Sequence, residues 1–453
     1  MAKEKKKSEV RKGFTPLWVT RTISFSLSWS VVGYITYYCT DHLGLSAGIV
    51  GMMLLVSKVI DAFTNFAAAY IVDNTHSKFG KGRPWDITMI PYWICIVLMY
   101  SIPQGWGDMA KYAMVFLSYT VINAGFGTIA SCVDNIYFKH ACFDEKKRNS
   151  AQAVNGACST IATVVGSILM PSMVAYFENI TNGWMIMTTI IAIPCLILGI
   201  TRLLTIPELD TDQTSSDDVP RVTIKETLTA FLTNKYVIIV TILYFIIQVI
   251  NQFASSPATY YYTYIVGNLS MYSIMQAVSF LAGLSLFVCV PLANKFGRAK
   301  VQMAAFTISL IGCFIRFFAG TNLLLLGISR VICSICLYPF LAFSGLMMID
   351  CMDYGEWKNK KRVEGAIFAG TGLGTTIGMG VGSALCGFVL EAFGYNGAAE
   401  AQTAFALFGI RVCYSLIPAI IMILAVVVLY FYDLDSKMPA IRAELRGEEA
   451  AQQ

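Results

Sequence analysis

The sequence predicts an all-α membrane protein with twelve transmembrane helices, and three observations support this fold class. Of the 453 residues, 56% are hydrophobic and only 13% are charged, against roughly 25% charged residues in an ordinary soluble domain. Apolar segments long enough for the roughly 20 residues of a spanning helix recur along almost the whole chain. Lys and Arg gather in alternate loops, as they do in proteins that cross a membrane many times.

In the first half of the chain, polar segments delimit six apolar spans. The basic tail "MAKEKKKSEVRK" precedes an apolar segment that is too long for a signal peptide, so we interpret that segment as the first span. The loop "SKFGKGRPW" follows the second span, "FDEKKRNS" the fourth and "ENITNG" the fifth. We therefore expect spans at 15–40, 47–72, 86–103, 109–137, 150–177 and 183–205.

The second half starts after "PELDTDQTSSDDVPRVTIKETLTAFLTN", the longest polar segment inside the chain. Its later part, with Leu228, Phe231 and Leu232 at helical spacing, is either an amphipathic helix on the membrane surface or a plain linker. The turn "KFGRAK" and the loop "EWKNKKRVEG" separate later apolar segments. We expect spans at 236–265, 269–294, 300–319, 322–349, 364–393 and 403–433.

The loops "DHLG", "ENITNG", "VGNLS" and "AGTN" carry no Lys or Arg, and they alternate with the basic loops. The positive-inside rule then places both termini in the cytoplasm. We interpret the net charge of +5 as this topology signal and expect no nucleic-acid partner. The expected organisation is a cytoplasmic basic tail (1–14), an N-terminal six-helix bundle (15–206), a cytoplasmic central loop (207–235), a C-terminal six-helix bundle (236–433) and a cytoplasmic C-terminal tail (434–453).

The two halves repeat each other. "KFGKGR" follows the second span and "KFGRAK" ends the eighth, with Phe79 and Phe296 separated by 217 positions (296 − 79). "KKRNS" and "KKRVE" follow the fourth and tenth spans, with Arg148 and Arg362 separated by 214 positions (362 − 148). Similar offsets at matching places indicate a parallel duplication, which puts a substrate path between two bundles that rock around it.

Three segments together resemble one transporter family. They are "SKVIDAFTNFAAAYIVDNTHSKFGKGRPW", "MMIDCMDYGEWKNKKRVEGAIFAGTGLGTTIGMGVGSALCGFVLEAFGYN" and "AAEAQTAFALFGIRVCYSLIPAIIMILAVVVLYFYDLD". They resemble the glycoside-pentoside-hexuronide:cation symporters, the melibiose-permease type, and the likeness covers most of the chain. It implies a major-facilitator fold of two pseudo-symmetric six-helix bundles.

The resemblance also implies a cation site on the second and fourth helices. The matching positions are Asp61, Thr64, Asn65, Thr120 and Asn123, and the first three share one helical face. The family has carboxylates where this chain has Asn65 and Asn123, so Asp61 is the only acid left. Because hard cations prefer anionic oxygen ligands, we expect a proton as the coupling ion before sodium, and no other cofactor.

Asp61 has two interpretations. It is a coupling carboxylate, because an acid in low dielectric can bind and release a cation during transport. Alternatively, it is the structural partner of Lys58, which lies one turn earlier on the same face. The family position favours coupling.

The family's sugar-contacting residues are largely replaced. The positions of its helix-one acid, helix-four aromatic, helix-five arginine and helix-eleven lysine fall at or near Phe25, Gly127, Asn155 and Thr376, and Lys58 replaces an arginine. We therefore expect a neutral, glycoside-like substrate. The expected substrate-binding residues are Trp29, Lys58, Asn123, Gln248, Asn251, Gln252 and Thr376. For the amides of the seventh span, hydrogen bonding between helices is an equal alternative.

Charged residues near the predicted cytoplasmic helix ends are expected to form an inner gate, although topology alone also explains each of them. They are Asp73, Lys81, Arg83, Asp134, Arg298, Asp350, Asp353, Glu356 and Arg362.

Three other features have mainly structural interpretations. Arg316, near the outer end of the ninth span, is expected to extend towards the lipid headgroups. The 13 cysteines are expected to be small core residues, with little indication of a disulfide framework. The glycines of "GTGLGTTIGMGVG" allow close helix packing or form a flexible gate.

The sequence thus predicts a cation-coupled secondary transporter that works by alternating access as a monomer in a bacterial inner membrane. The alternatives are an uncoupled facilitator and a transporter-like sensor. A membrane enzyme is least favoured, because its candidate acids Asp350, Asp353 and Glu356 belong to the symporter-like segment. The cytoplasmic segments contain no Walker loop, nucleophile elbow or zinc motif, so ATP-driven transport by this chain alone is not expected.

Overall fold

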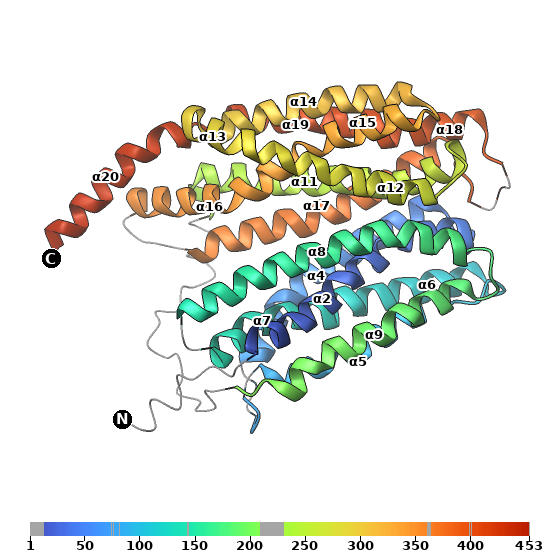
Figure 1. The fold of residues 1–453 in the computed structure, drawn as a ribbon, viewed down its shortest axis with the longest axis horizontal. Coiled ribbons are helices and arrows are strands. Elements are labelled where there is room, and N and C mark those ends of the chain that lie inside the picture. Colours follow the sequence, from blue (N-terminus) through green and yellow to red (C-terminus); the bar gives the residue numbers. More distant parts are fainter. Residues whose placement is uncertain are drawn as a thin grey trace. The chain divides into compact units, whose positions relative to one another are not determined.

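The computed structural model describes residues 13–142 except 74, 76 and 81, then 145–208, 231–359, 364–397, 399 and 401–452. All regular secondary structure in these ranges is helical (Figure 1). The chain divides into two compact units. Unit 1 contains α2 to α9 with Asn268–Ser273 and Asn396–Ala401, and unit 2 contains α11 to α20 apart from those two segments.

Unit 1 consists of long helices joined by short irregular turns. Its helices are α2 (Phe14–Val32), α3 (Ile35–Tyr37), α4 (Ala47–Asp73), α5 (Met89–Met99), α6 (Asp108–Thr120), α7 (Thr128–Ala141), α8 (Glu145–Phe177) and α9 (Gly183–Thr205). The 3-10 helix η2 (Arg83–Thr88) leads into α5, and the π-helical turns η1 (Tyr38–His42) and η3 (Val121–Gly127) follow α3 and α6.

Unit 2 likewise consists of α-helices with short 3-10 and π-helical segments. Its elements are α11 (Lys235–Tyr260), η4 (Tyr261–Ile265), α12 (Ser270–Ser279), η5 (Phe280–Ser285), α13 (Leu286–Phe296), α14 (Arg298–Ala319), α15 (Leu323–Ser334), α16 (Leu337–Asn359), α17 (Glu364–Ala392), α18 (Ala404–Arg411), η6 (Val412–Leu416), α19 (Ile417–Tyr430) and α20 (Leu434–Gln452).

Helices lie over each of the twelve predicted spans, and the all-helical membrane fold is confirmed. Within the described ranges, nine helices are long and apolar enough to cross a membrane. The segment predicted as a C-terminal tail (434–453) forms the helix α20 over residues 434–452. Leu228 and most of the central polar segment lie outside the described residues, and the predicted bundle boundaries stay predictions.

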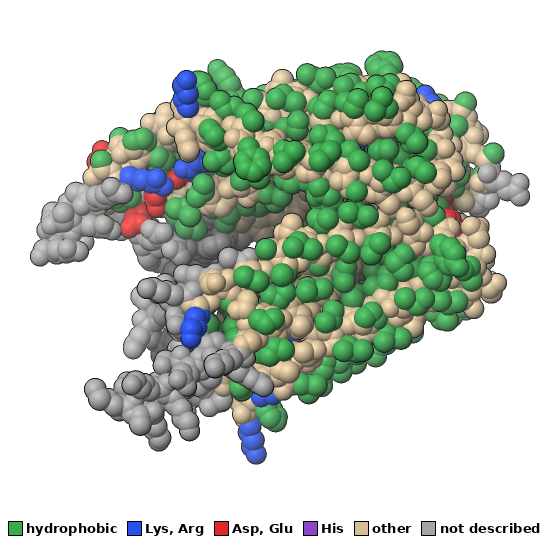
Figure 2. Space-filling view, viewed as in Figure 1, with side chains coloured by type: hydrophobic (Ala, Val, Ile, Leu, Met, Phe, Trp, Pro, Cys, Tyr) green, Lys and Arg blue, Asp and Glu red, His purple; other side chains and the backbone are tan. Residues whose placement is uncertain are grey.

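The helices turn apolar side chains outwards, as expected for a protein whose solvent is lipid. Hydrophobic side chains cover most of the visible surface along α8 and α9 in unit 1 and along α12 to α14 in unit 2 (Figure 2). Phe287, Phe318 and Leu324 are 81%, 79% and 73% exposed. Because burial of such side chains is normally favourable by about 1.5 to 3 kcal/mol each, hydrocarbon must cover them.

Glycines allow the backbones of α11 and α17 to approach each other closely. A methyl group added at Gly374 would lie 2.4 Å from the Thr241 carbonyl oxygen, and one at Gly378 would lie 2.5 Å from the Phe245 carbonyl oxygen. The two glycines are one turn apart on the face of α17 that meets α11. Of the two interpretations of this glycine-rich segment, the structure supports close helix packing.

We predict that Gly378→Ala destabilises the protein by about 1 to 3 kcal/mol, because the new methyl group forces α17 away from α11. Gly372→Ala is the matched control on the same helix, since a methyl group there meets nothing within 4 Å. Thermal unfolding of the purified variants measures the difference. Equal unfolding temperatures for the two variants would contradict the packing argument.

Candidate functional site

A buried ion pair lies in the middle of α4. Lys58 is 3% exposed, and its ammonium nitrogen lies 3.6 Å from Asp61 Oδ2, one turn along the helix. The Asp61 side chain is 15% exposed, so it is the more accessible partner. A charge inside an apolar helix costs roughly 2.5 to 3.5 kcal/mol on insertion scales, and the pairing offsets part of that cost.

The π-helical turn η3 and the residue that follows it, Thr128 at the start of α7, supply further partners for this pair. Lys58 donates to Asn123 Oδ1 at 2.8 Å, and Thr128 donates its hydroxyl to Asp61 Oδ1 at 2.7 Å. The Thr128 hydroxyl also lies 2.9 Å from the Asn123 carbonyl oxygen, five residues earlier, which accepts the Thr128 backbone N–H in the wider π turn. The turn therefore brings an amide and a hydroxyl to the ion pair at once.

Gly127 belongs to the same turn. A methyl group added there would lie 2.8 Å from the Ile122 carbonyl oxygen, so a side chain requires the turn to shift. Where the resembling family has an aromatic residue, this chain has a glycine that fits the π turn.

Two aromatic rings face the ammonium group. Lys58 Nζ lies 5.2 Å from the ring centroid of Trp29 on α2 and 5.7 Å from that of Tyr119 on α6. Cation–π contacts of this kind contribute about 0.5 to 2 kcal/mol. Trp29 is 39% exposed and packs edge-on against Phe25 at 6.2 Å. It therefore offers an apolar surface next to a polar, paired charge, as sugar sites require.

The site has no net charge, since one ammonium and one carboxylate face each other. Among the side chains described around Lys58, Asp61 supplies the only carboxylate. No group of three or more His, Cys, Asp or Glu side chains suited to a metal ion occurs in the described ranges. The arrangement can exchange a proton at Asp61, and it leaves Lys58 positively charged when Asp61 is neutral.

The structure places the other predicted cation-site residues unevenly. Thr64 lies on α4 and donates its hydroxyl to the Asp61 carbonyl oxygen at 3.1 Å, not to the carboxylate. The Thr120 hydroxyl is buried and makes no hydrogen bond within the described part of the chain. The side chain of Asn65 lies outside the described residues.

The predicted amides of unit 2 differ in their partners. Asn251 donates to Gln248 Oε1 at 3.0 Å, and both residues belong to α11. Gln252 donates to the Met379 carbonyl oxygen at 3.3 Å and to the Ser383 hydroxyl, both on α17. Only Gln252 of the three therefore makes the hydrogen bond between helices that was the alternative to substrate binding. Thr376 lies half-buried on α17.

Unit 1 contains a second ion cluster that joins α2, η2, α7 and α9. Arg202 donates to Asp86 at 2.8 and 2.5 Å, and its third nitrogen lies 2.8 Å from Asp134. Arg21 Nε lies 3.1 Å from Asp86, and another of its nitrogens donates to Asp134. Arg21, Asp86 and Arg202 are at most 1% exposed. Two cations and two anions thus neutralise each other in the interior.

The loop between α4 and η2 is anchored beside this cluster. Glu208 accepts hydrogen bonds from the backbone N–H groups of Gly82 at 2.7 Å and Arg83 at 3.1 Å. Gly80 has φ +95° and lies directly against the Glu208 carboxylate, where no side chain fits. The Arg83 guanidinium donates to the Leu203 carbonyl oxygen at 2.9 Å. The glycines of the "KFGKGRPW" motif therefore allow the loop backbone to approach the Glu208 carboxylate closely.

Unit 2 has its own ion cluster, next to a pocket of about 630 Å³. Arg298 lies 2.6 Å from one oxygen of Asp350, Arg442 on α20 lies 2.8 Å from the other, and Arg442 also lies 3.3 Å from Asp353. Asp435 accepts from the Ala299 N–H at 2.8 Å and so caps α14.

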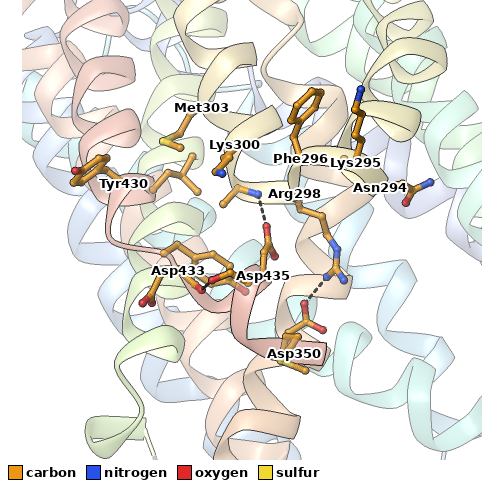
Figure 3. Close-up of a pocket in the computed structure, with 17 residues that line it drawn as sticks. Asn294, Lys295, Phe296, Arg298, Lys300, Met303, Asp350, Tyr430, Asp433 and Asp435 are labelled. Atoms are coloured by element: carbon orange, nitrogen blue, oxygen red, sulfur yellow. Dashed lines mark hydrogen bonds and ion pairs between the residues drawn. The ribbon is translucent and has the colours of Figure 1, made fainter. Parts of the chain in front are cut away.

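Figure 3 shows how these side chains line the pocket. Arg298 extends to Asp350, whereas Lys295 and Phe296 point away from the acids. The pocket lies at the junction of α13, α14 and α20, so α20 closes one of its sides.

The remaining predicted gate residues are only partly visible. The side chain of Asp73, and Lys81 and Arg362 entirely, lie outside the described residues. Glu356 lies half-buried on α16.

Several residues of these clusters were not among the sequence predictions: Arg21, Asp86, Thr128, Arg202 and Arg442. A charged side chain inside a predicted span was the available signal for Arg21 and Arg202. No such signal exists for Thr128, because hydroxyls are common in membrane helices.

Comparisons with known proteins show which proteins the chain resembles. A family model described as MFS/sugar transport protein matches residues 23–436. The isoprimeverose transporter of Lactiplantibacillus pentosus is 28% identical, over 94% of this chain and 89% of that protein. A glucuronide carrier protein homolog of Escherichia coli is 22% identical, over 95% and 94%. The crystal structure of a D-xylose-proton symporter superposes with a TM-score of 0.63 and 15% identity, over 94% and 98%.

We predict that Asp86→Asn destabilises the protein by about 3 to 5 kcal/mol, because it leaves Arg21 and Arg202 buried with too little negative charge. Asp108→Asn is the control, since Asp108 is 76% exposed and its pair with Lys111 is long at 3.8 Å; it should change stability by at most about 0.5 kcal/mol. Chemical or thermal unfolding in detergent compares the two. Similar stability of both variants would show that the cluster does not hold unit 1 together.

Proposed function

The chain belongs to the MFS/sugar transport protein family and is a secondary active sugar transporter, and we propose that it couples the movement of a neutral glycoside to a proton through Asp61. It is a transporter and not an enzyme. The observation that carries the proposal is the Lys58–Asp61 pair, which is bonded to η3 and lies beside the exposed ring of Trp29.

Protonation of Asp61 changes what Lys58 can do. In the structure, the ammonium group is shared between Asp61 at 3.6 Å and Asn123 at 2.8 Å. A neutral Asp61 no longer attracts the ammonium group, which can then donate to a sugar hydroxyl over Trp29. Substrate and proton therefore favour each other's binding, which is the requirement for coupled transport.

The charge of the unloaded and loaded site determines whether the membrane potential drives transport. The empty site with ionised Asp61 is neutral, and the site loaded with proton and glycoside carries one positive charge. Only the loaded site moves charge across the membrane, which contributes about 2.3 kcal/mol per 100 mV. This energy supports accumulation of a few tens-fold.

A proton suits this site better than sodium does. Sodium is a hard cation that needs several oxygen ligands, preferably anionic. Asp61 is the single described carboxylate at the pair, and both of its oxygens have partners, Thr128 and Lys58. A sodium ion would have to replace the Lys58 ammonium, whereas a proton needs only one carboxylate oxygen.

A neutral glycoside suits the site better than a hexuronide does. The positions of the family's helix-five arginine and helix-eleven lysine are Asn155 and Thr376 here, so the predicted site offers a sugar carboxylate Lys58 and no second cation. With Asp61 protonated and a carboxylate paired to Lys58, the loaded site would be neutral and would gain nothing from the membrane potential. The names of the relatives include both an isoprimeverose transporter and a glucuronide carrier homolog, so the family alone does not choose between them.

The same proposal includes the setting of the protein. It is a multi-pass membrane protein, and we place it in a bacterial inner membrane as a monomer with both termini in the cytoplasm, on the basis of the basic loops. The ion clusters at Asp134 and Asp350 then lie on the cytoplasmic side, where they serve the inner gate.

We predict that Asp61→Asn abolishes proton-driven accumulation and leaves equilibrative exchange. Uptake of radiolabelled glycosides into proteoliposomes under an imposed proton gradient measures this. The parent protein should accumulate a few tens-fold at 100 mV, and the variant should reach only equal concentrations.

Asp108→Asn, which changes an exposed carboxylate of the same unit, should accumulate like the parent. Gradient-independent uptake by the parent, with an unchanged Asp61→Asn variant, would instead identify a facilitator in which the Lys58–Asp61 pair is structural. Accumulation driven by sodium alone would contradict proton coupling.

We predict that neutral glycosides compete for uptake at least about tenfold better than the matching glucuronides, since Asn155 and Thr376 offset the desolvation of a sugar carboxylate less well than an arginine and a lysine would, at a cost above about 1.4 kcal/mol. Trp29→Ala should raise the half-saturation concentration for the preferred glycoside, and Trp29→Phe should retain most of the affinity. A glucuronide that binds more tightly than its neutral analogue would overturn the assignment of substrate class.

A further inference from the structure

Arg316 on α14 is a buried cation without an acidic partner. It is 2% exposed, so the expectation that it extends to the lipid headgroups is wrong. Its guanidinium group stacks 4.0 Å from the ring centroid of Tyr414 in η6, which keeps the side chain inside the unit. No carboxylate forms an ion pair with Arg316 among the described residues, and its Nε and Nη1 make no hydrogen bond there.

Two thiols take the place where a carboxylate would be expected. The remaining guanidinium nitrogen of Arg316 lies 3.7 Å from Cys313 Sγ, and Cys313 Sγ lies 3.6 Å from Cys333 Sγ on α15. Both thiols are buried. A guanidinium group next to a thiol favours the thiolate, because the negative sulfur is the counter-charge that the buried cation lacks.

The helices that carry the two thiols meet at backbone distance. A methyl group added at Gly312 would lie 2.8 Å from the Cys333 backbone nitrogen and 2.9 Å from its sulfur. Ser309 donates its hydroxyl to the Ile332 carbonyl oxygen at 3.1 Å, which fixes the same crossing one turn away. The small residue at position 312 thus allows the close approach that a disulfide needs.

A third thiol lies nearby but is turned elsewhere. Cys333 and Cys336 have the C-x-x-C spacing, a pattern that the sequence prediction passed over. In the structure the Cys336 thiol donates to the Cys333 carbonyl oxygen at 3.4 Å. In the neutral form, Cys333 can donate to the Ser309 carbonyl oxygen at 3.8 Å and Cys313 to Met422 Sδ at 4.0 Å.

We propose that Cys313 and Cys333 form an oxidisable dithiol site, in which Arg316 stabilises one thiolate shared by the pair and a two-electron oxidant links α14 to α15 by a disulfide bond. The two sulfurs hydrogen bond to each other, so either of them can attack the oxidant first and the other follows. The sulfur atoms must approach from 3.6 Å to about 2.05 Å, which rotation of the two side chains can provide.

The reaction with diamide, a membrane-permeant azo oxidant, balances as follows. The thiolate sulfur of the pair attacks one nitrogen of the N=N bond, and the other nitrogen takes up a proton from the surroundings, so that a sulfenyl hydrazide forms. The second thiol then attacks that sulfur, loses its proton to the departing nitrogen and forms the S–S bond. The two sulfurs give up two electrons in total, and the N=N bond is reduced to a hydrazine that carries one proton from the second thiol and one from the surroundings.

A second pair of buried thiols in the same unit provides an internal control. The buried thiols of Cys386 on α17 and Cys413 in η6 also lie close enough to interact with each other, and within the described residues neither makes a hydrogen bond to an arginine. The two pairs thus share burial and proximity and differ in the cation.

The test treats the full-length protein in detergent with diamide and follows cross-linked peptides by mass spectrometry. We expect the 313–333 cross-link to form at least about tenfold faster than a 386–413 cross-link, because one unit of thiol acidity changes the thiolate fraction about tenfold. Cys313→Ser should abolish it, Arg316→Gln should slow it about tenfold, and Arg316→Lys should retain most of the rate.

Three results would overturn the proposal. They are no 313–333 cross-link in the parent, equal rates for the two thiol pairs, and an unchanged rate in Arg316→Gln. If Arg316→Gln does not fold, the comparison of the two pairs in the parent protein still decides. Because no substrate is needed, the outcome is independent of the proposed transport activity.

Discussion

A charge inside a membrane protein must find its partners within the protein, and the candidate site depends on how Lys58 meets this constraint. Its ammonium group is 3% exposed and is held by Asp61, Asn123 and two aromatic rings. The π turn η3 is the local distortion that makes this possible, because it points Asn123 and Thr128 at the same pair. Because Asp61 is the ion-pair partner of Lys58, any change in the charge of Asp61 changes the electrostatic stabilisation of the Lys58 ammonium group.

The same constraint explains the two larger ion clusters, and Arg316 meets it without a carboxylate among the described residues. In unit 1, Arg21 and Arg202 are matched by two aspartates, and in unit 2 Asp350 is matched by Arg298 and Arg442. Each cluster ties three or more elements together, so it can act both as a structural anchor and as a part that rearranges as a unit. Arg316 alone is buried beside thiols and a tyrosine, and for that reason it is the place where reactive sulfur chemistry is expected.

The sequence predicted the spans well, because apolar length and the positions of basic loops are one-dimensional signals. Lys58 and Asp61 were also predictable, since one turn of helix separates them. Asn123 was predicted through the family resemblance, but Thr128 was not, because the register of a π turn and the hydroxyl that it points at Asp61 depend on tertiary packing. Arg316 was misjudged for the same reason: distance from the helix end indicated an exposed side chain, whereas packing against Tyr414 buries it. Gln252 on α11 could be assigned to helix packing only when its partners on α17 were known.

The central claim is that glycoside and proton bind together at Asp61. Proton uptake on substrate binding tests it most directly: saturating glycoside is added to the purified protein in weakly buffered detergent solution, with a pH-indicating dye. The account predicts that glycoside binding takes up protons and makes the solution more alkaline, and that an Asp61→Asn variant which still binds glycoside gives no such signal. Glycoside binding without proton uptake by the parent protein, across the pH range in which it binds, would contradict the account.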